Sequence, residues 1–433
     1  MNPTADRRLF LQGVAALSAS ALSANAMSSP AAAAEKTDAN SRVSIGIMGT
    51  GSRGSAISKG MLKLGSVDIA AVCDVDQAAA QRTADSIAKS QTKRPEVFSD
   101  FRQMLDQDSI DAIVCAAPNH WHAPATIMGC QAGKHVYVEK PCSHNPAEGE
   151  MAIQAARAAN RVVQMGTQRR SWPAIIEAVD RIHSGTIGEA LYSRCWYNNR
   201  RPSIGHGTEQ TPPDGFDWDL WQGPAPRVAF KDNVVPYNWH WNWLWGNGEL
   251  GNNGVHAIDV ARWGLQATYP ERVTAGGGKY RHDDDQETPD TMMVTYDFPD
   301  KKTITWEGLS WSPLGPHGSR FGLSFHGTEG SIVINGSGFV LYDMKDKQID
   351  QQTGAGGDQD HFADFVDAIR NDRRPNADIE IAHQSTLLCH LGNIAYRTES
   401  VLHTDPQNGR IVDNPDAAKL WSRSYADGWQ PKV

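Results

Sequence analysis

Residues 43–54 read VSIGIMGTGSRG and join an apolar run to a segment with helical character. The apolar run predicts a short buried strand, and a helix is expected from about residue 55 to residue 64. Between them, Gly49, Gly51 and Gly54 follow the order G-x-G-x-x-G. These glycines permit a tight turn, a close approach of the backbone to a pyrophosphate, and close packing of helix on strand. The pattern predicts a dinucleotide-binding turn. Its other members are Thr50, Ser52 and Arg53.

The next apolar run ends directly before Asp74, twenty residues after Gly54. A carboxylate at this position accepts hydrogen bonds from both ribose hydroxyls of NAD and repels the 2′-phosphate of NADP. Val75 and Asp76 follow, and no arginine stands there to bind that phosphate. The sequence therefore favours NAD over NADP. The structural alternative for Asp74 is a helix N-cap.

Strands and helices alternate as far as residue 165, which predicts a parallel sheet with helices on both faces. The helices are expected at residues 99–105, with Ser99 as the cap, and at 123–132 and 145–160. The strands are expected at residues 67–73, 111–117, 135–138 and 161–165. Ligands bind beyond the carboxyl ends of such strands. The loops expected at that edge are 118–122, 139–141 and 166–170.

The charge balance of the 433-residue chain excludes several classes of partner. The chain carries 41 Lys and Arg against 50 Asp and Glu, a formal net charge of −9. A nucleic-acid binder needs a basic surface to displace counterions, and an anionic membrane attracts the same surface. Beyond the N-terminus, no stretch approaches the roughly 20 apolar residues of a membrane helix. We expect no nucleic acid and no membrane anchor.

Residues 1–34 have the character of an export signal. Arg7 and Arg8 precede Leu-Phe-Leu, residues 13–22 form a short apolar core, and small-residue cleavage points end at Ala26 and Ala34. We expect export by the twin-arginine route to the periplasm, and a disordered Ala/Ser-rich tail is the alternative. The expected organisation is a signal over 1–34, a dinucleotide-binding domain over 35–165 and a second domain over 166–433.

The six cysteines form no C-x-x-C pair, and the histidines show no zinc spacing, so no metal site is expected. Several cysteines stand in apolar runs, which favours core positions over disulfide bonds. They are Cys73, Cys115, Cys130, Cys142, Cys195 and Cys389.

Further motifs resemble the Gfo/Idh/MocA family, the glucose–fructose oxidoreductase and inositol dehydrogenase superfamily, in its exported branch. The most specific is GKHVYVEKP at residues 133–141, and GNNGVHAID at 251–259 resembles the active-site helix of the family. The other motifs are residues 49–54, 73–74, 118–122, 326–330 and 375–380. The resemblance implies a Rossmann domain followed by an α/β domain with a large, mostly antiparallel open sheet. Alternating runs at 291–298 and 302–309 agree with such a sheet, whose open face implies a homodimer or homotetramer.

The resemblance implies that Lys140 is the catalytic lysine; the alternative is a surface lysine near a turn. In an apolar or cationic pocket its pKa falls, so that it can take a proton from the reacting hydroxyl. Glu139 is expected to orient Lys140 or to contact the nicotinamide ribose. His256 is the expected general base. Asp259 can fix the imidazole tautomer, or it can pair with Arg262.

Asn252 departs from the simplest family pattern, in which an aspartate stands four residues before the active-site histidine. An amide exchanges no proton, although it can hydrogen-bond a sugar hydroxyl. The departure puts a His/Asp/Lys proton relay in doubt, and the sequence does not identify the exact substrate.

The remaining expected contacts lie in the predicted loops and in a tryptophan-rich stretch over residues 196–245. Tryptophan faces stack on sugars, but the same residues can pack a loop or a subunit interface, and both interpretations stay open. The expected contacts to the nicotinamide and its ribose are Asn119, Trp121, His122 and Gln168. Alternatively, His120 and His122 contact the substrate, or these polar residues satisfy loop backbone. The expected substrate contacts are Arg169, Tyr237, Trp239, Asn252 and Asp259.

These features predict an exported oxidoreductase that moves hydride between a tightly bound NAD and a hydroxyl carbon of a sugar or glycoside. One alternative is a glycoside hydrolase that retains NAD and works by oxidation and elimination. Another is a sugar-binding protein without catalysis.

Overall fold

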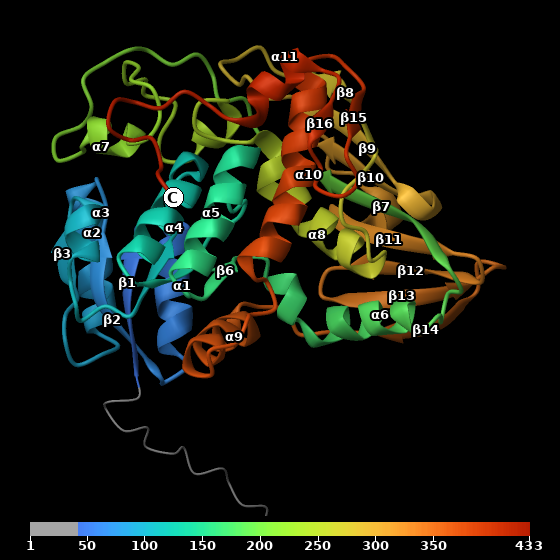
Figure 1. The fold of residues 1–433 in the computed structure, drawn as a ribbon, viewed down its shortest axis with the longest axis horizontal. Helices are drawn as coiled ribbons and strands as arrows, with labels where there is room; N and C mark the ends of the chain where they lie inside the picture. Colours follow the sequence, from blue (N-terminus) through green and yellow to red (C-terminus); the bar gives the residue numbers. More distant parts are fainter. Residues whose placement is uncertain (1–41) are drawn as a thin grey trace, which may run out of the picture. The chain divides into compact units, whose positions relative to one another are not determined.

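The computed structural model describes residues 42–433 (Figure 1). The predicted export signal over residues 1–34 lies outside the described residues. Within residues 42–433, no helix has both the length and the apolar character needed to cross a bilayer.

The first domain contains a six-stranded sheet in which every strand pair is parallel, as the alternating pattern predicts. The strand order is β3-β2-β1-β4-β5-β6, and it reverses at β1 between β2 and β4. The carboxyl ends of the strands at such a reversal form the usual ligand crevice. The strands are β1 (Val43–Met48), β2 (Val67–Cys73), β3 (Glu96–Phe98), β4 (Ala112–Cys115), β5 (His135–Val138) and β6 (Val163–Met165).

The helices of this domain differ from expectation mainly at the start of α4. They are α1 (Ser52–Leu62), α2 (Gln77–Ala88), α3 (Phe101–Leu105), α4 (Asn119–Gln131) and α5 (Pro146–Ala158). Residues 119–122, expected in a loop, form the first turn of α4. Pro124, which follows this turn in α4, has no N–H, so the His120 carbonyl accepts a hydrogen bond from Arg423 Nη2 at 2.7 Å instead. The cap of α3 is Asp100 rather than Ser99, because its carboxylate accepts the Arg102 amide.

The second domain is built on a ten-stranded sheet in the order β14-β13-β12-β11-β7-β10-β9-β8-β15-β16. Only β7 and β10 pair in parallel within it, so the predicted mostly antiparallel sheet is confirmed. Its strands are β7 (Ala190–Asn198), β8 (Arg272–Gly278), β9 (Thr291–Phe298), β10 (Lys302–Leu309), β11 (Phe321–Gly327), β12 (Gly330–Asn335), β13 (Gly338–Asp343), β14 (Gln348–Gln352), β15 (Leu402–Thr404) and β16 (Ile411–Val412).

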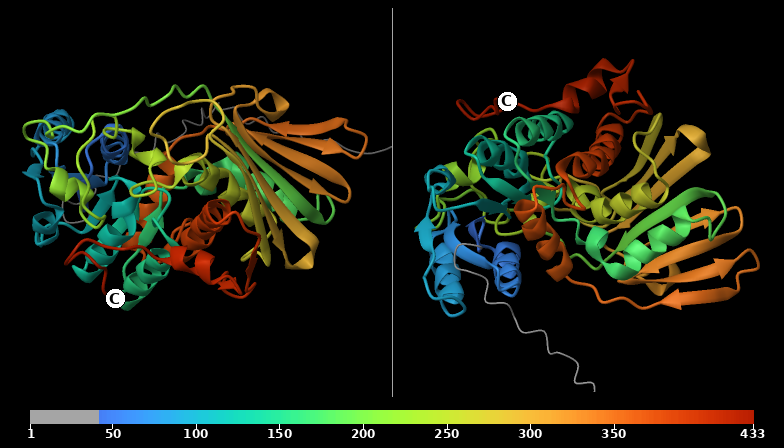
Figure 2. Two further views of the ribbon diagram at one scale, coloured as in Figure 1. Left: turned by 90° about the horizontal axis from the view of Figure 1, so that it is seen from above. Right: turned by 60° about the horizontal axis from the view of Figure 1, so that its bottom comes forward.

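Helices lie along one face of this sheet (Figure 2). Those against it are α6 (Pro173–His183), α8 (Val255–Gly264) and α10 (Ile379–Arg397). A π-helix, η4 (Leu250–Gly254), leads directly into α8. The remaining helical elements are η2 (Gln168–Ser171), α7 (Trp218–Gln222), η3 (Asn238–Trp241), η5 (Pro299–Lys301), η6 (Pro316–Gly318), α9 (Gln359–Arg370), α11 (Pro415–Ala418) and η7 (Lys419–Trp421).

The chain returns to the first domain after the second sheet. Phe362 and Phe365 of α9 are buried against Tyr137 of β5, with ring centroids 5.7 and 5.8 Å apart. Helix α10 packs on α5 as well as on the second sheet. Residues far beyond 166 therefore complete the core of the dinucleotide-binding domain. This domain is built from more than one continuous segment of the chain.

A long insertion, residues 199–249, connects β7 to η4 and carries its own small core. Trp218 stacks on Trp221 at 4.7 Å, and Trp245 meets Trp221 edge-on at 5.2 Å. Part of the tryptophan-rich stretch is thus packing, which was one of the two interpretations left open by the sequence.

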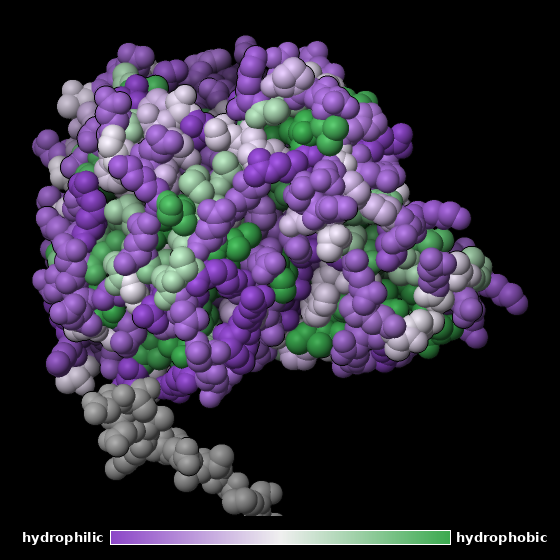
Figure 3. All heavy atoms as spheres, in the orientation of Figure 1, coloured by the Kyte–Doolittle hydropathy of each residue, from purple (hydrophilic) through white to green (hydrophobic). Residues whose placement is uncertain are grey.

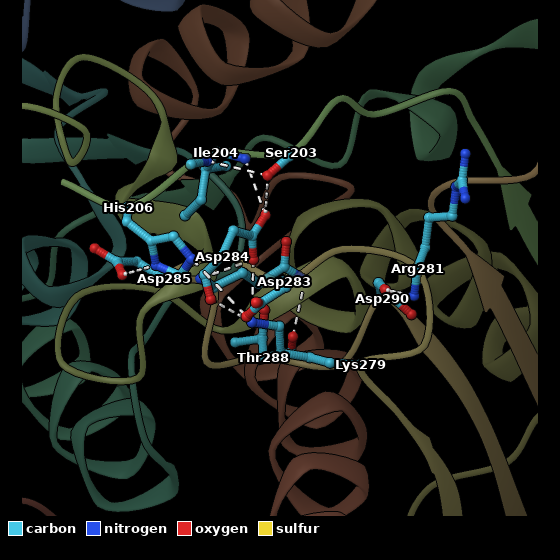
Figure 4. Close-up of polar contacts among 12 residues, drawn as sticks. Ser203, Ile204, His206, Lys279, Arg281, Asp283, Asp284, Asp285, Thr288 and Asp290 are labelled. Carbon is cyan, nitrogen blue, oxygen red and sulfur yellow. Dashed lines mark hydrogen bonds and ion pairs between the residues drawn. The ribbon is translucent and has the colours of Figure 1, made fainter.

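Two neighbouring aspartates fasten the start of the insertion to the loop between β8 and β9 (Figure 4). Asp284 accepts hydrogen bonds from Ser203 Oγ at 2.9 Å and from the Ile204 amide at 3.0 Å. Asp285 lies 3.0 Å from His206 Nδ1 and accepts the Gly207 amide at 2.9 Å. The amide of Gly207 is the main cause that lowers the pKa of Asp285. These acids hold loop backbone in place.

All six cysteines are buried with free thiols, as the apolar runs around them indicated. The face drawn in Figure 3 is mostly hydrophilic, with apolar residues scattered among polar ones. Scattered apolar residues are normal for the surface of a globular protein.

Candidate active site

A cleft of about 1100 Å³ opens at the carboxyl ends of β1, β2, β4 and β5, where the strand order reverses. Most of the site residues expected from the sequence lie on its wall. They are Gly49, Thr50, Gly51, Ser52, Arg53, Asp74, Asn119, Trp121, His122, Glu139, Lys140, Gln168, Tyr237, Trp239 and Asn252.

The glycine turn at one end of the cleft has the geometry that a pyrophosphate requires. Gly49 has φ +87°, and a Cβ there would lie 2.7 Å from the backbone of Ala116. A Cβ on Gly54 would lie 1.8 Å from the Gly49 carbonyl, so this glycine sets the helix packing. Gly51 faces open space and caps α1 with no side-chain hydrogen bond. The first amides of α1 are therefore available to an anion.

Asp74 follows β2 and is held by the same turn. Its Oδ2 accepts the Thr50 amide at 2.6 Å and Thr50 Oγ1 at 2.8 Å, and its Oδ1 accepts the Asp76 amide at 3.0 Å. Burial raises the pKa of Asp74, and these hydrogen bonds oppose that shift. The cap of α2 is Asp76, which accepts the Ala79 amide. The interpretation of Asp74 as a helix cap is therefore wrong, and its carboxylate faces the cleft.

Arg53 connects the glycine turn to the end of β5. Its Nε donates to Glu139 at 2.7 Å and its Nη1 to Asp358 at 2.7 Å, while its buried Nη2 has no partner among residues 42–433. Burial alone would lower the pKa of Arg53, but Glu139, Tyr137 and Asp358 outweigh it and raise the pKa. The other carboxylate oxygen of Glu139 accepts a hydrogen bond from the Lys140 amide at 3.3 Å, so Glu139 fixes the backbone of Lys140.

Lys140 meets the π-helix at the middle of the cleft. Its Nζ donates to both the carbonyl and the Oδ1 of Asn252, each at 2.8 Å. π-Helical turns inside α-helices are frequent at functional sites. Two of the three ammonium protons are committed, which leaves one for a ligand. Burial lowers the pKa of Lys140, and Arg53 and Arg201 act in the same direction against Glu139 and Glu249.

Asn252 is a neutral replacement for a carboxylate at this position. It holds Lys140 in place without adding a negative charge that would stabilise the ammonium. Its Nδ2 lies 3.5 Å from the Tyr237 hydroxyl. Asn252 thus fixes Lys140 by two hydrogen bonds and adds no charge beside it.

His256 stands in the first turn of α8, four residues after Asn252. It is partly exposed and is not among the residues that line the cleft. Burial lowers its pKa well below 6.5, and the positive charges of Lys140 and Arg169 lower it further. The imidazole is therefore neutral at neutral pH, and its low pKa makes it a weak proton acceptor in this arrangement.

Both sequence interpretations of Asp259 are wrong. Its carboxylate forms a bidentate ion pair with Arg170, at 2.8 Å to Nε, and accepts Ser385 Oγ at 2.6 Å. It therefore contacts neither His256 nor Arg262 by a hydrogen bond and does not line the cleft. The reason is that α8 presses this side chain inward, where it is 1% exposed between η2 and α10. Asp259 is a structural anchor of α8.

Arg169 also lies away from the cleft wall. Its Nη1 donates to the Gly336 carbonyl at 2.7 Å, and its guanidinium stacks between Trp172 and Phe321. Burial lowers the pKa of Arg169 to about 10. In this arrangement the side chain joins η2 to the second sheet and acts on His256 through its charge.

Trp121 and His122 hold the walls of the cleft together. Trp121 Nε1 donates to the Trp221 carbonyl at 3.0 Å, which fastens α4 to the insertion. The ring nitrogens of His122 lie 2.6 Å from the Pro141 carbonyl and 2.8 Å from the Ala117 carbonyl. His122 thus ties the turn after Lys140 to the start of α4.

Behind Tyr237 and Asn252 of the cleft lies a network that sequence reasoning did not connect. Arg201 pairs with Glu249, at 2.6 Å from Nε to Oε2, and its Nη1 donates to the Tyr237 hydroxyl at 3.3 Å. Glu249 precedes Asn252 by three residues, which is a helical spacing, but no local pattern relates either of them to Arg201. The network therefore connects Arg201 to Tyr237, Tyr237 to Asn252, and Asn252 to Lys140.

Residues 213–217 of the insertion, here called the strap, cross over the turn that follows Asp74. The Gln77 amide donates to the Gly215 carbonyl at 3.1 Å, and the Asp217 amide donates to the Val75 carbonyl at 3.0 Å. Pro213, Asp214 and Phe216 line the cleft from this side. The strap therefore covers the end of the cleft that carries Asp74.

Curated relatives match parts of this chain. An α-N-acetylgalactosaminidase of Shewanella oneidensis and a glycosyl hydrolase family 109 protein of Shewanella baltica are each 28% identical over 159 residues, 36% of this chain. These matches span 35% of the length of each relative. A levoglucosan dehydrogenase of Pseudarthrobacter phenanthrenivorans is 28% identical over 258 residues, 55% of this chain and 58% of the relative.

Solved structures share the fold over most of the chain. Levoglucosan dehydrogenase in complex with NADH and levoglucosan has a TM-score of 0.66 at 20% identity, covering 84% of this chain and 99% of its own. Aldose-aldose oxidoreductase from Caulobacter crescentus has a TM-score of 0.66 at 17% identity, with the same coverage.

Two domain models match the chain in order. Residues 43–167 match the oxidoreductase family model with an NAD-binding Rossmann fold, and residues 219–333 match the GFO/IDH/MocA C-terminal domain. Both domains of one family thus occur in this sequence, and the glycine turn and Asp74 lie within the NAD-binding one. The chain belongs to the Gfo/Idh/MocA family of oxidoreductases.

Proposed function

We propose that this protein is an NAD-dependent oxidoreductase that acts on a hydroxyl carbon of a sugar or glycoside. The observation that carries the proposal is Lys140, whose ammonium is fixed by Asn252 at the centre of a cleft that also contains the NAD-binding turn. Levoglucosan dehydrogenase, the relative matched over the greatest length above, acts on a sugar derivative by name.

Different residues of the cleft perform different steps of an alcohol oxidation. When bound, the nicotinamide takes up or returns the hydride. Lys140, with its lowered pKa, takes the proton from the substrate hydroxyl at Nζ as the C–H bond is broken. His256, four residues after Asn252, is the second group that we propose for handling the proton. Tyr237, Trp239 and Asn252 line the substrate end, where they bind hydroxyls and a sugar face. We propose C3 of a pyranose as the reacting carbon.

The proposal includes a cofactor that stays bound between turnovers. The strap crosses the Asp74 end of the cleft, and the first amides of α1 are available to a phosphate. Retention also suits the export signal proposed for residues 1–34, because free NAD is scarce outside the cytoplasm. A second sugar or an external acceptor would then reoxidise the cofactor in the same cleft.

Near-ultraviolet absorbance of the purified holoprotein tests this function directly. A reduced-nicotinamide band should appear when the correct sugar or glycoside is added, and a keto-sugar or an artificial acceptor should discharge it. Finding no nucleotide after denaturation of the holoprotein would contradict a retained cofactor. Equal sugar affinity in Lys140→Ala and wild type, with no turnover in either, would support a binding protein instead.

The second candidate is a glycoside hydrolase that retains NAD, favoured by the match to the α-N-acetylgalactosaminidase over 159 residues. In that cycle, oxidation at C3 acidifies the C2 proton, a base removes it, and the glycosidic group leaves before water adds and hydride returns. Release of the aglycone without net redox change, with deuterium incorporated at C2 from D₂O, would identify it.

We further propose that the protein is a homodimer or homotetramer that associates through the sheet face opposite α6, α8 and α10. Met293 on β9 is 54% exposed, which is high for a methionine in a sheet. Light scattering coupled to size-exclusion chromatography should give twice or four times the chain mass, and Met293→Glu should reduce it.

A further inference from the structure

His240 belongs to η3 and lines the cofactor cleft together with Lys140, Tyr237 and Asn252. Its imidazole packs against two aromatic rings. The ring centroid of His240 lies 3.6 Å from that of the Trp239 indole and 4.4 Å from that of the Tyr237 ring. These contacts fix the plane of the imidazole at the substrate end of the cleft.

A single hydrogen bond determines which ring nitrogen of His240 carries a proton. Nδ1 lies 2.6 Å from the Tyr237 carbonyl, which can only accept, so Nδ1 is the donor. Burial lowers the pKa of His240 to about 3, and the positive charges of Lys140 and Arg201 act in the same direction. The ring is therefore neutral near neutral pH, and its Nε2 carries a lone pair that can accept a hydrogen bond.

The Nε2 atom of His240 opens into the cleft. It has no hydrogen-bond partner among residues 42–433, yet it keeps accessible surface, unlike the two enclosed and unpaired ring nitrogens of His144. A second cavity, of about 1000 Å³, is lined by other residues of the segment 238–247, such as Trp243, and not by His240. The accessible Nε2 therefore faces the cofactor cleft.

Lys140 and Tyr237, which line the cleft with His240, offer hydrogen-bond donors to a ligand. The Tyr237 oxygen lies 3.3 Å from Arg201 Nη1 and 3.5 Å from Asn252 Nδ2, both donors, so its own proton is free for a ligand. Lys140 has one free ammonium proton, and it already occupies Asn252 Oδ1. A sugar hydroxyl that accepts from one of these donors still has its own proton to donate. His240 Nε2 provides the acceptor for that proton.

We propose that His240 Nε2 accepts a hydrogen bond from a substrate hydroxyl next to the one that meets Lys140, and that it thereby selects sugars with a hydroxyl at that position. The inference rests on the proposed function, because it takes the ligand of the cleft to be a sugar. The role is binding and not proton transfer, since an imidazole with so low a pKa is a weak proton acceptor. A site that hydrogen-bonds a hydroxyl rejects the analogue that lacks it, because a polar group of the site is then left unpaired.

Three variants separate this acceptor from the packing of the ring. His240→Phe keeps an aromatic ring on Trp239 and removes Nε2, while the Tyr237 carbonyl still accepts the backbone amide of the substituted residue at 3.4 Å. His240→Asn keeps an N–H near Nδ1 for that carbonyl and also removes Nε2, so it decides if His240→Phe does not fold. His240→Gln returns an acceptor oxygen near the place of Nε2.

Titration calorimetry of the holoprotein tests the proposal with methyl glucoside, methyl galactoside, levoglucosan and singly deoxygenated forms of each. In the wild type, at least one parent sugar should bind, and loss of one of its hydroxyls should weaken binding about tenfold. His240→Phe and His240→Asn should bind the parent about tenfold more weakly and should no longer distinguish it from that deoxygenated form. His240→Gln should recover most of the discrimination.

His183→Phe is the matched control, because His183 is exposed, contacts the Trp263 carbonyl through Nε2 and does not line the cleft. It should discriminate like the wild type, and every variant should keep its NAD content. Discrimination of wild-type strength in His240→Phe and His240→Asn, loss of NAD in place of sugar affinity, or no binding of any sugar would overturn the proposal. A sugar that binds without producing the reduced-nicotinamide band would instead contradict the proposed oxidation and leave the comparison of variants valid.

Discussion

The cofactor cleft and the second cavity have similar volumes, about 1100 and 1000 Å³, and share residues 238–247, yet their polar groups are organised differently. In the cleft, Lys140 is bonded to Asn252 and Arg53 is bonded to Glu139. Around the second cavity, atoms of His144 and four other residues remain unpaired. The cleft holds charges in fixed positions, which is what chemistry requires. Beside the second cavity, these buried atoms have no hydrogen-bond partner among residues 42–433, so their hydrogen-bonding capacity is unused in the structure.

The largest expected effect comes from Lys140→Met, which removes the fixed ammonium from the cleft. We expect turnover to fall about 10³-fold, because a positioned acid or base contributes roughly 10²–10⁴ in rate. The sugar should still bind, since Tyr237 and Trp239 remain. The rate of appearance of the reduced-nicotinamide band in a stopped-flow experiment measures this.

Lys134→Met is the control for that change. Lys134 belongs to the same GKHVYVEKP motif and is 7% exposed, but its Nζ donates to the Gln107 carbonyl, outside the cleft. Its removal should lower stability and leave the rate per folded molecule unchanged. Equal losses of rate in both variants would remove Lys140 from the catalytic role.

The next effect concerns the paired groups behind the cleft. Asp259→Asn leaves Arg170 buried without its counter-charge, and breaking such a pair costs about 3 kcal/mol or more. The free energy of unfolding, from urea denaturation, should fall by that amount. Asp68→Asn breaks the more exposed pair with Arg42, where Asp68 is 47% exposed, and should cost about 0.5 kcal/mol. Similar losses in the two variants would show that α8 is not anchored through Asp259.

The difference between these regions also marks how far sequence reasoning reaches. The glycine turn, Asp74 and Lys140 occur in short continuous motifs, whose local geometry nearly determines what they do. The strands predicted at 291–298 and 302–309 coincide with β9 and β10 for the same reason, since a period of two is local. Asp259 was misassigned because its partners, Arg170 and Ser385, are 89 and 126 residues away along the chain.

The second cavity illustrates the same limit more strongly. Its walls come from segments near residues 144, 243, 393 and 423, and of these only the tryptophan-rich stretch around residue 243 stood out in the sequence. An unpaired buried atom is a property of the folded chain, so no sequence pattern reveals it. The first turn of α4 was assigned to a loop and the helix was expected only from residue 123, whereas α4 begins at Asn119. In the structure, Arg423 satisfies the carbonyl that the proline leaves free.

A third prediction tests whether the strap separates the cleft from solvent. Phe216→Ala removes a side chain that lines the cleft next to the Asp76 backbone. We expect NAD to dissociate about tenfold faster, because one buried aromatic side chain contributes roughly 1.5–3 kcal/mol. The NAD content after repeated dilution and filtration measures it. Phe230→Ala disturbs the same aromatic cluster without lining the cleft and should retain the cofactor. Equal retention in Phe216→Ala and wild type would leave the strap without a role.

The smallest expected effect comes from adding a negative charge at position 252, where the cleft has the neutral amide of Asn252. Lys140 must be neutral to accept a proton, so the oxidation rate should rise with pH until its lowered pKa is passed. Asn252→Asp places a carboxylate at the hydrogen-bonding distance of 2.8 Å and stabilises the ammonium. The rising limb of the pH–rate profile should therefore move upward by about one pH unit.

Asn335→Asp makes the same charge change at an exposed position at the end of β12 and should leave the profile in place. A profile that moves downward, or not at all, in Asn252→Asp would mean that Lys140 does not titrate in the rate-limiting step. An unchanged profile with a lower rate would leave Lys140 as a fixed ammonium that orients the hydroxyl. His256 would then be the group whose ionisation sets the rate. The pH profile thus separates a lysine that moves a proton from one that only holds the substrate.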